Sequence, residues 1–236
     1  MALGQVLELG TARQLFVDGL LIENMDAVER ILHHPVKQNV AIAPENPWEK
    51  SALFCGVFAE DEGVFKCWYR CDEDSGKAAK SGGGRWTAYA ESSDGIVWTK
   101  PNLGIFEYNG SKDNNLIWQG PGSNLAPFRD PNLNVPKSER YKAVVRTKDL
   151  LALVSPDGIH WKMLQDDPIL TEGPYDSPNV CFWDHIQGEY VTYVRGIVGT
   201  GTPLKRELDI SIWKEGVRWI RRSRSKDFKN WTLPEP

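Results

Sequence analysis

The sequence predicts an all-β fold in which about three four-stranded sheets repeat along the chain. The 236 residues include 10 Trp, 7 Tyr and 8 Phe together with 21 Gly and 15 Pro, a composition that favours short strands and turns. No long amphipathic helix is visible in the hydrophobic pattern. A hairpin motif also recurs three times, with its copies roughly 65 residues apart.

The hairpin motif has the form Ser-x-Asp-x-x-x-Trp. Its copies read SSDGIVW at 92–98, SPDGIHW at 155–161 and SKDFKNW at 225–231. Ser and Asp side chains can accept hydrogen bonds from the backbone of a tight turn while glycine takes a positive φ, and the tryptophan then packs on the returning strand. We therefore expect these motifs to fix hairpins and not to carry chemistry.

A second repeat precedes each hairpin motif: an aromatic residue opens a strand and an arginine closes it five positions later. The pairs are Phe65 and Arg70, Tyr141 and Arg146, and Tyr190 and Arg195. An apolar run stands before each pair, so every unit reads as four strands, the pattern of a propeller blade. Such blades cannot bury both faces alone and must stack around an axis.

These repeats predict a single, partial β-propeller domain over 1–236. Its expected blades cover about 48–101, 122–166 and 175–233. In the N-terminal part, 1–47, the apolar runs 15–19, 21–23 and 28–34 are expected to be strands that close or cap the ring.

Charge and composition exclude several classes of partner. A net charge of −4 and a pI near 5.7 argue against binding to nucleic acid or to an anionic membrane surface. The N-terminus has no basic stretch followed by an apolar run, which predicts a cytoplasmic protein. The four cysteines and four histidines show no metal-binding spacing, so no metal and no cofactor is predicted, and the cysteines are expected to be buried. A second copy of the chain could cover exposed blade edges.

Propeller geometry selects the candidate site residues. The residues just before each innermost strand meet at one mouth of the central channel, and here they are the segments 47–51, 122–130 and 174–179. At these points the chain resembles the five-bladed propeller glycoside hydrolases of the arabinanase, xylosidase and fructosidase superfamily. YDSPNVCFWDHIQGEYVTYVRG at 175–196 and NLAPF at 124–128 are similar to their inner-strand motifs. More narrowly, the pattern resembles an uncharacterised hydrolase-like group from environmental bacteria.

This resemblance implies hydrolysis of furanosides or related oligosaccharides by a general base, a general acid and a third carboxylate that tunes the acid. Asp176 matches the tuning aspartate. Glu49 stands where the base would be, with a surface carboxylate paired to Lys50 as the alternative. Asp130 follows its strand and is either catalytic or a turn-former.

The resemblance also implies a set of substrate contacts. The candidate substrate-binding residues are Trp48, Asn124, Tyr175, Asn179 and Trp183, and each aromatic residue among them could instead belong to the core. The acid is expected as Glu in a Glu-Gly-Pro setting of a later blade, and the motif at 172–174 does not stand there. A carbohydrate-binding propeller without catalysis, or a truncated inactive fragment, is therefore the alternative function.

Overall fold

The structure is a computed structural model that describes residues 10–11, 15–19, 21–50, 52–72, 85–171, 173–176, 178–198 and 217–235, without the side chains of 52–55, 72, 123 and 198. The chain divides into two compact units, Met1–Asn39 and Val40–Pro236. The two units are described separately below.

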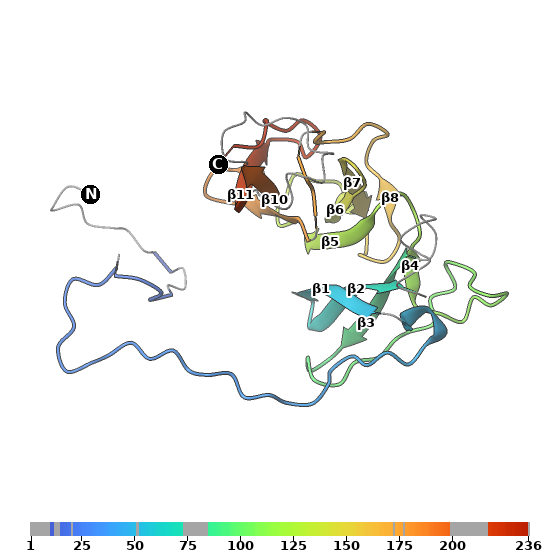
Figure 1. Ribbon diagram of the computed structural model, residues 1–236, viewed down its shortest axis with the longest axis horizontal. Helices are drawn as coiled ribbons and strands as arrows, with labels where there is room; N and C mark the ends of the chain where they lie inside the picture. Colours follow the sequence, from blue (N-terminus) through green and yellow to red (C-terminus); the bar gives the residue numbers. More distant parts are fainter. Residues whose placement is uncertain are drawn as a thin grey trace. The chain divides into compact units, whose positions relative to one another are not determined.

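The described part of the first unit, drawn in blue in Figure 1, contains no strand. The apolar runs at 15–19, 21–23 and 28–34 have irregular backbone where the structure describes them, and their side chains are exposed, Leu32 by 88%. A strand is stable only when a neighbour satisfies its backbone groups, and these runs have no paired strand among the described residues. Their predicted role in closing a ring stays a prediction.

The second unit consists of three antiparallel sheets in which the strands follow one another in chain order. The first sheet contains β1 (Ala52–Asp61), β2 (Val64–Asp72), β3 (Arg85–Ser92) and β4 (Leu116–Trp118). The second contains β5 (Ser123–Arg129), β6 (Tyr141–Arg146), β7 (Leu150–Ser155) and β8 (Lys162–Met163). The third contains β9 (Val180–Asp184), β10 (Glu189–Val198) and β11 (Val217–Ser225). Single bridges from Trp231 and Glu235 extend the third sheet beyond β11.

The only helices in the described ranges are two 3₁₀ turns, η1 (Pro47–Glu49) and η2 (Lys137–Glu139). None of the described helices has the length or the apolar character needed to cross a membrane. The prediction of an all-β chain is confirmed.

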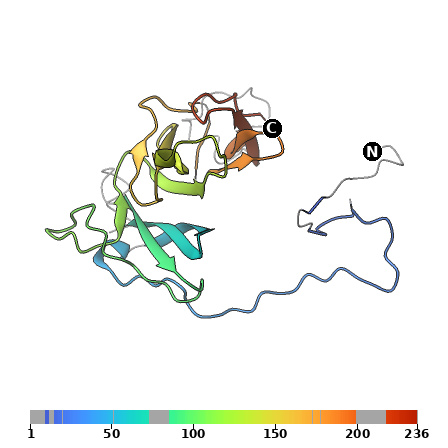
Figure 2. The same cartoon turned by 180° about the vertical axis from the view of Figure 1, so that it is seen from behind.

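The three sheets stack face to face, with the second in the middle. Successive residues of a strand point to opposite faces of its sheet. Tyr141 and Val145 of β6 accordingly pack with Trp68 of the first sheet, whereas Val144 packs in a cluster with Cys181 of the third. Figure 1 shows the first sheet on one side of β5, and Figure 2 shows the same order from behind.

A third apolar cluster covers the other face of the first sheet. It contains Trp48, Tyr69, Trp86 and Leu116 among its buried residues. Each face of the first sheet is thus packed against side chains, as a sheet inside a stack requires.

The three hairpin motifs adopt one geometry. In the first, Ser92 Oγ accepts the N–H groups of Asp94 and Gly95 at 3.2 and 2.9 Å. The Trp98 indole N–H closes the turn on the Gly95 carbonyl at 3.2 Å. The motifs at 155–161 and 225–231 repeat these bonds. Their predicted role in fixing hairpins is confirmed.

The third hairpin motif has a phenylalanine at the position of positive φ, where the other two have glycine. Gly95 and Gly158 have φ of 73° and 82°, and Phe228 takes their place with φ of 65°. A positive φ is strained for a bulky residue. The Phe228 ring is fully buried and lies edge-on against Tyr190 and Trp231, and this burial offsets the strain.

The cysteines follow the sequence prediction as far as the structure describes them. Cys67, Cys71 and Cys181 are buried free thiols. The side chain of Cys55 lies outside the described residues.

Candidate functional site

The starts of the innermost strands and the ends of their neighbours form one region of the second unit, which we call the mouth: Arg70, Asn124, Arg146, Asp176 and Arg195. Antiparallel pairing sets Arg70 opposite Phe54 near the start of β1 and Arg146 opposite Ser123 at the start of β5. The three arginines are those that close the repeated strands in the sequence.

Asn124 links the first two sheets at the mouth. The residue sits in a break of the β5–β6 register and has φ of 61°, a conformation that asparagine tolerates better than most residues. Its buried side-chain oxygen accepts a hydrogen bond from Arg70 Nη1 at 2.9 Å. Asn124, predicted as a substrate contact, is thus engaged by a neighbouring sheet.

Asp176 is a solvent-accessible carboxylate at the mouth. Its side chain is 43% exposed, and its Oδ2 accepts a charge-assisted hydrogen bond from Arg195 Nη1. Arg195 Nε also donates to the Pro174 carbonyl at 3.0 Å, and Asn179 Nδ2 donates to the Asp176 carbonyl at 2.9 Å. Side chain and backbone of Asp176 are therefore both held, while the carboxylate still faces solvent.

Positive charge gathers around Asp176. Burial lowers the pKa of the Arg195 guanidinium, Asp176 opposes this shift, and the charges of Arg218 and Arg146 add to the lowering. Arg146 and Arg195 come from different sheets, so the second and third sheets contribute like charges to the same mouth.

Glu49 occupies a different environment. The residue is 0% exposed at the end of η1. Its carboxylate accepts hydrogen bonds from the Tyr69 hydroxyl at 2.7 Å, from Lys100 Nζ at 3.0 Å and from the N–H groups of Glu45 and Asn46. The alternative of a surface carboxylate paired with Lys50 is wrong, because the side chain is enclosed and its ion pair is with Lys100.

These contacts keep Glu49 ionised. Burial acts to raise its pKa, but the hydrogen bonds from Tyr69, the two backbone N–H groups and Lys100 outweigh burial and hold the pKa below its usual range. No hydrogen bond or ion pair joins the described Glu49 and Asp176 side chains. The geometry of Glu49 is that of a structural anion beneath the first sheet.

Asp130 lies at the opposite end of β5 from Asn124. The six residue steps from Asn124 to Asp130 place their Cα atoms about 20 Å apart. Asp130 Oδ2 accepts the Tyr190 hydroxyl at 2.7 Å and pairs with Lys142 Nζ at 3.2 Å, and its Oδ1 accepts the N–H of Asn132 at 2.9 Å. Asp130 therefore both forms a turn and ties the second sheet to the third.

The same link joins the first and second sheets. Asp61, at the end of β1, accepts the Tyr141 hydroxyl. Asp61 also pairs with Arg129 at 2.6 Å and with Arg140 at 2.8 Å. The repetition supports a structural role for Asp130, whose predicted catalytic role has no support from its position.

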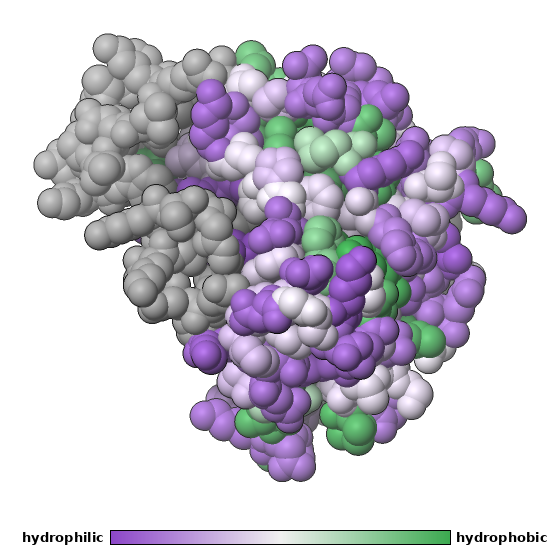
Figure 3. All heavy atoms as spheres, turned by 90° about the vertical axis from the view of Figure 1, so that its right-hand side faces the viewer, coloured by the Kyte–Doolittle hydropathy of each residue, from purple (hydrophilic) through white to green (hydrophobic). Residues whose placement is uncertain are grey.

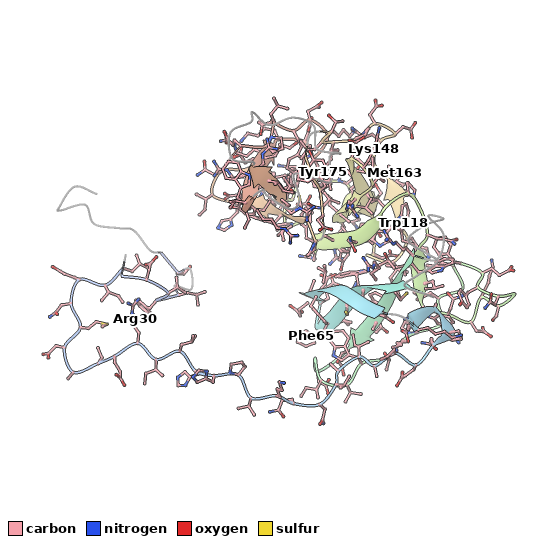
Figure 4. All side chains as sticks on the ribbon, in the orientation of Figure 1. Arg30, Phe65, Trp118, Lys148, Met163 and Tyr175 are labelled. Carbon is pink, nitrogen blue, oxygen red and sulfur yellow. The ribbon has the colours of Figure 1, made fainter. Side chains whose placement is uncertain are left out.

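Two of the predicted aromatic contacts, Trp48 and Tyr175, are buried, and the third, Trp183, is partly buried. Trp48 is 8% exposed, donates its indole N–H to Asn115 at 3.0 Å and meets Tyr108 edge-on. Tyr175 is buried in the core cluster between the second and third sheets (Figure 4). Trp183 lies edge-on against Tyr190, with ring centroids 4.7 Å apart. None of these rings forms an exposed platform.

The sequence identified the arginine in the second half of each second strand but not its place in the site. The signal was the constant position of Arg70, Arg146 and Arg195 after the aromatic residue. Their convergence depends on how the sheets stack, which the repeat alone does not give.

Outside the mouth, the described surface offers a cavity and no cluster of metal-binding side chains. A shallow cavity of about 470 Å³ lies over the third hairpin motif, where it is lined by Glu189, Lys226 and Trp231 among others. The coloured residues of the face drawn in Figure 3 are mostly hydrophilic, with small separate apolar areas. Within the described ranges, no three His, Cys, Asp or Glu side chains are placed to hold a metal ion.

Comparison with solved structures finds proteins of similar fold. A protein described as "Glycoside hydrolase" matches with a TM-score of 0.50 and 16% identity over 82% of this chain and 58% of its own. The chain shares the fold of glycoside hydrolases. The predicted all-β propeller fold is confirmed, whereas the number of blades stays a prediction.

Two further matches have the same TM-score of 0.50. One is a putative glycosidase from Bacteroides thetaiotaomicron, with 15% identity over 80% of this chain and 55% of that one. The other is a structure described as a BT0996 RGII complex, with 16% identity over 83% and 59%. The chain thus spans less than two thirds of the length of each of these three proteins. No family model matches the sequence, and no curated protein matches it.

Proposed function

We propose that this propeller is a glycoside hydrolase-like protein that acts on furanosides or related oligosaccharides, and that its sugar site is the mouth. The observation that carries the proposal is Asp176, a carboxylate 43% exposed and oriented by Arg195 at the start of the third sheet. The shared fold supports it, since the chain has the architecture of proteins described as glycoside hydrolases.

Asp176 is suited to one of the roles that glycoside hydrolysis requires. A carboxylate in an ion pair with a guanidinium accepts hydrogen bonds, so Asp176 can orient a sugar hydroxyl or a neighbouring acid. Proton donation to the leaving group needs another residue. Glu49 is enclosed and Asp130 lies at the other end of β5, so neither is placed to supply that proton. Glu172 lies outside the described residues.

The second candidate function is carbohydrate binding without catalysis. The enclosure of Glu49 favours this alternative, because hydrolysis requires two carboxylates beside the scissile bond and the side chain of Glu49 is fully buried. Proton donation contributes about 10²–10⁴-fold to the rate of such reactions. The two candidates therefore differ by a measurable rate.

The test is release of the aryl group from a panel of aryl furanosides and pyranosides. We expect Asp176→Ala to lower the rate at least about 100-fold. Asp184→Asn serves as a matched control, because this aspartate ends β9 at the opposite end of the third sheet and binds the turn N–H of Ile186. Unchanged hydrolysis in Asp176→Ala would overturn the site, and saccharide binding without any hydrolysis would select the second candidate.

A further inference from the structure

Arg146 is a partly buried guanidinium without a partner among the described residues. Five described arginines have a buried nitrogen that makes no hydrogen bond. Four of them, namely Arg70, Arg195, Arg221 and Arg224, bond through another nitrogen to a neighbouring group. Arg146 makes no side-chain hydrogen bond and no ion pair to any residue that the structure describes, and its Nε is shielded from solvent.

An uncompensated charge of this kind is costly to bury. Partial removal of a cation from water is unfavourable unless an anion or hydrogen-bond acceptors replace the lost hydration. Buried polar groups in folded proteins are usually satisfied, so an exception calls for an explanation. A ligand that supplies the missing anion is one explanation, and the location of Arg146 supports it.

Arg146 ends β6 opposite Ser123, the residue before Asn124, and so belongs to the mouth. Arg70 reaches Asn124 from the first sheet, and Arg195 reaches Asp176 in the third. Arg70 and Arg195 therefore each have a partner at the mouth. Arg146 is the guanidinium of the three that has no hydrogen-bond or ion-pair partner among the described residues.

We propose that the mouth binds the carboxylate group of an acidic sugar, a uronic acid unit of a glycan, with Arg146 as its principal ligand. The planar fork of a guanidinium matches a planar carboxylate through two parallel hydrogen bonds. The sugar ring then lies beside Asp176. This inference rests on the proposed function in assigning a glycan to the mouth, and it adds the substrate class.

Calorimetric titration of the 236-residue chain tests the inference without requiring turnover. The ligands are oligosaccharides containing galacturonate or glucuronate and the same oligosaccharides after reduction of the carboxyl groups to alcohols. We expect the acidic forms to bind at least about tenfold more tightly. Arg146→Gln should weaken acidic binding by about 10- to 100-fold and change neutral binding by less than about threefold.

Arg222→Gln is the matched control, because Arg222 is an exposed arginine on β11 that pairs with Glu235. Its affinity for acidic sugars should equal that of the wild type. Arg146→Lys retains the charge without the fork, so its affinity should lie between those of wild type and Arg146→Gln. Equal binding of acidic and reduced sugars by the wild type would overturn the inference.

Two more measurements separate competing explanations. Inorganic phosphate or sulfate, added at the same concentration as the acidic sugar, should displace that sugar poorly. If either ion displaces the sugar as strongly as a free uronate does, the mouth is a site for small oxyanions and the proposal is overturned. Thermal unfolding should show an unchanged or higher Tm for Arg146→Gln, because an unpaired charge is removed. A lower Tm together with unchanged acidic binding would make Arg146 a structural residue.

The outcome is independent of the hydrolysis assay. Hydrolysis of neutral furanosides without preference for acidic ligands would leave the proposed function standing and remove this inference. Preferential binding of acidic sugars without hydrolysis would remove the proposed hydrolysis and leave this inference standing.

Discussion

Replacing Asp130 with asparagine tests whether this residue joins sheets or performs catalysis. The Asp130 and Lys142 side chains are 0% and 1% exposed, and their charged groups lie 3.2 Å apart. Asparagine keeps the shape and an acceptor for the Tyr190 hydroxyl but leaves the Lys142 ammonium without its buried counter-ion. Glu139, at 3.4 Å from the same ammonium, retains part of the compensation. Loss of one partner of a buried pair costs about 3–5 kcal/mol, so we expect the lower end, about 3 kcal/mol.

Urea unfolding monitored by tryptophan fluorescence measures this loss. Asp184→Asn is the control, because Asp184 occupies in the third sheet the position that Asp130 occupies in the second. Asp184 pairs with Glu189, as Asp130 pairs with Arg140. The residue equivalent to Lys142 is Val191, so the control aspartate has no lysine partner there. We expect Asp184→Asn to lower the free energy of unfolding by less than about 1 kcal/mol.

The double variant Asp130→Asn/Lys142→Met should recover at least about half of the loss, because removing both charges leaves no unpaired ion. A cost below about 1 kcal/mol for Asp130→Asn would refute the reasoning. If Asp130→Asn abolished hydrolysis and left the free energy of unfolding unchanged, Asp130 would be a catalytic residue.

Three further predictions follow from individual side chains. Burial acts to raise the pKa of Asp157, but hydrogen bonds from the His160 N–H and ring outweigh it and lower the pKa from 3.8 to about 2. A depressed carboxyl pKa stabilises the fold above about pH 4, and this contribution is lost as the pH falls towards 2. Urea unfolding at several pH values should therefore show that the free energy of unfolding falls less between about pH 4 and pH 2 in Asp157→Asn than in the wild type. An equal fall in both proteins would contradict this. Trp48→Ala should lower the free energy of unfolding by about 3–5 kcal/mol while the folded fraction keeps its sugar affinity; selective loss of affinity would instead make Trp48 a sugar platform. Burial raises the pKa of the Cys67 thiol to about 12, so iodoacetamide at pH 8 should label Cys67 only after unfolding, as peptide mass spectrometry can show, and labelling of the native protein would refute its burial.

The sequence predicts the features that are encoded locally. The hairpin motifs were readable because Ser, Asp and Trp act within seven residues, so spacing alone fixes the contacts of Ser92, Asp94 and Trp98. The aromatic and arginine repeat likewise located the second strand of every sheet. The order of strands and the all-β class follow from these local signals.

Features that depend on the stacking of sheets were not predictable in this way. The sequence predicted that Glu49 is the base or a surface carboxylate paired with Lys50. In the structure its side chain is buried and binds Lys100, 51 positions along the chain. Asp130 could be assigned to a turn, but its partners Lys142 and Tyr190 come from two different sheets. Trp48 stands where a sugar platform would be expected, and its contact with Asn115 places it in the core instead.

The most direct test of the central claim is a crystal structure of the protein with a furanose-containing oligosaccharide. We predict a sugar at the mouth, with a hydroxyl within about 3.2 Å of the Asp176 carboxylate. A sugar bound only in the shallow cavity beside Glu189 and Trp231, with no contact to Asp176, would contradict the account.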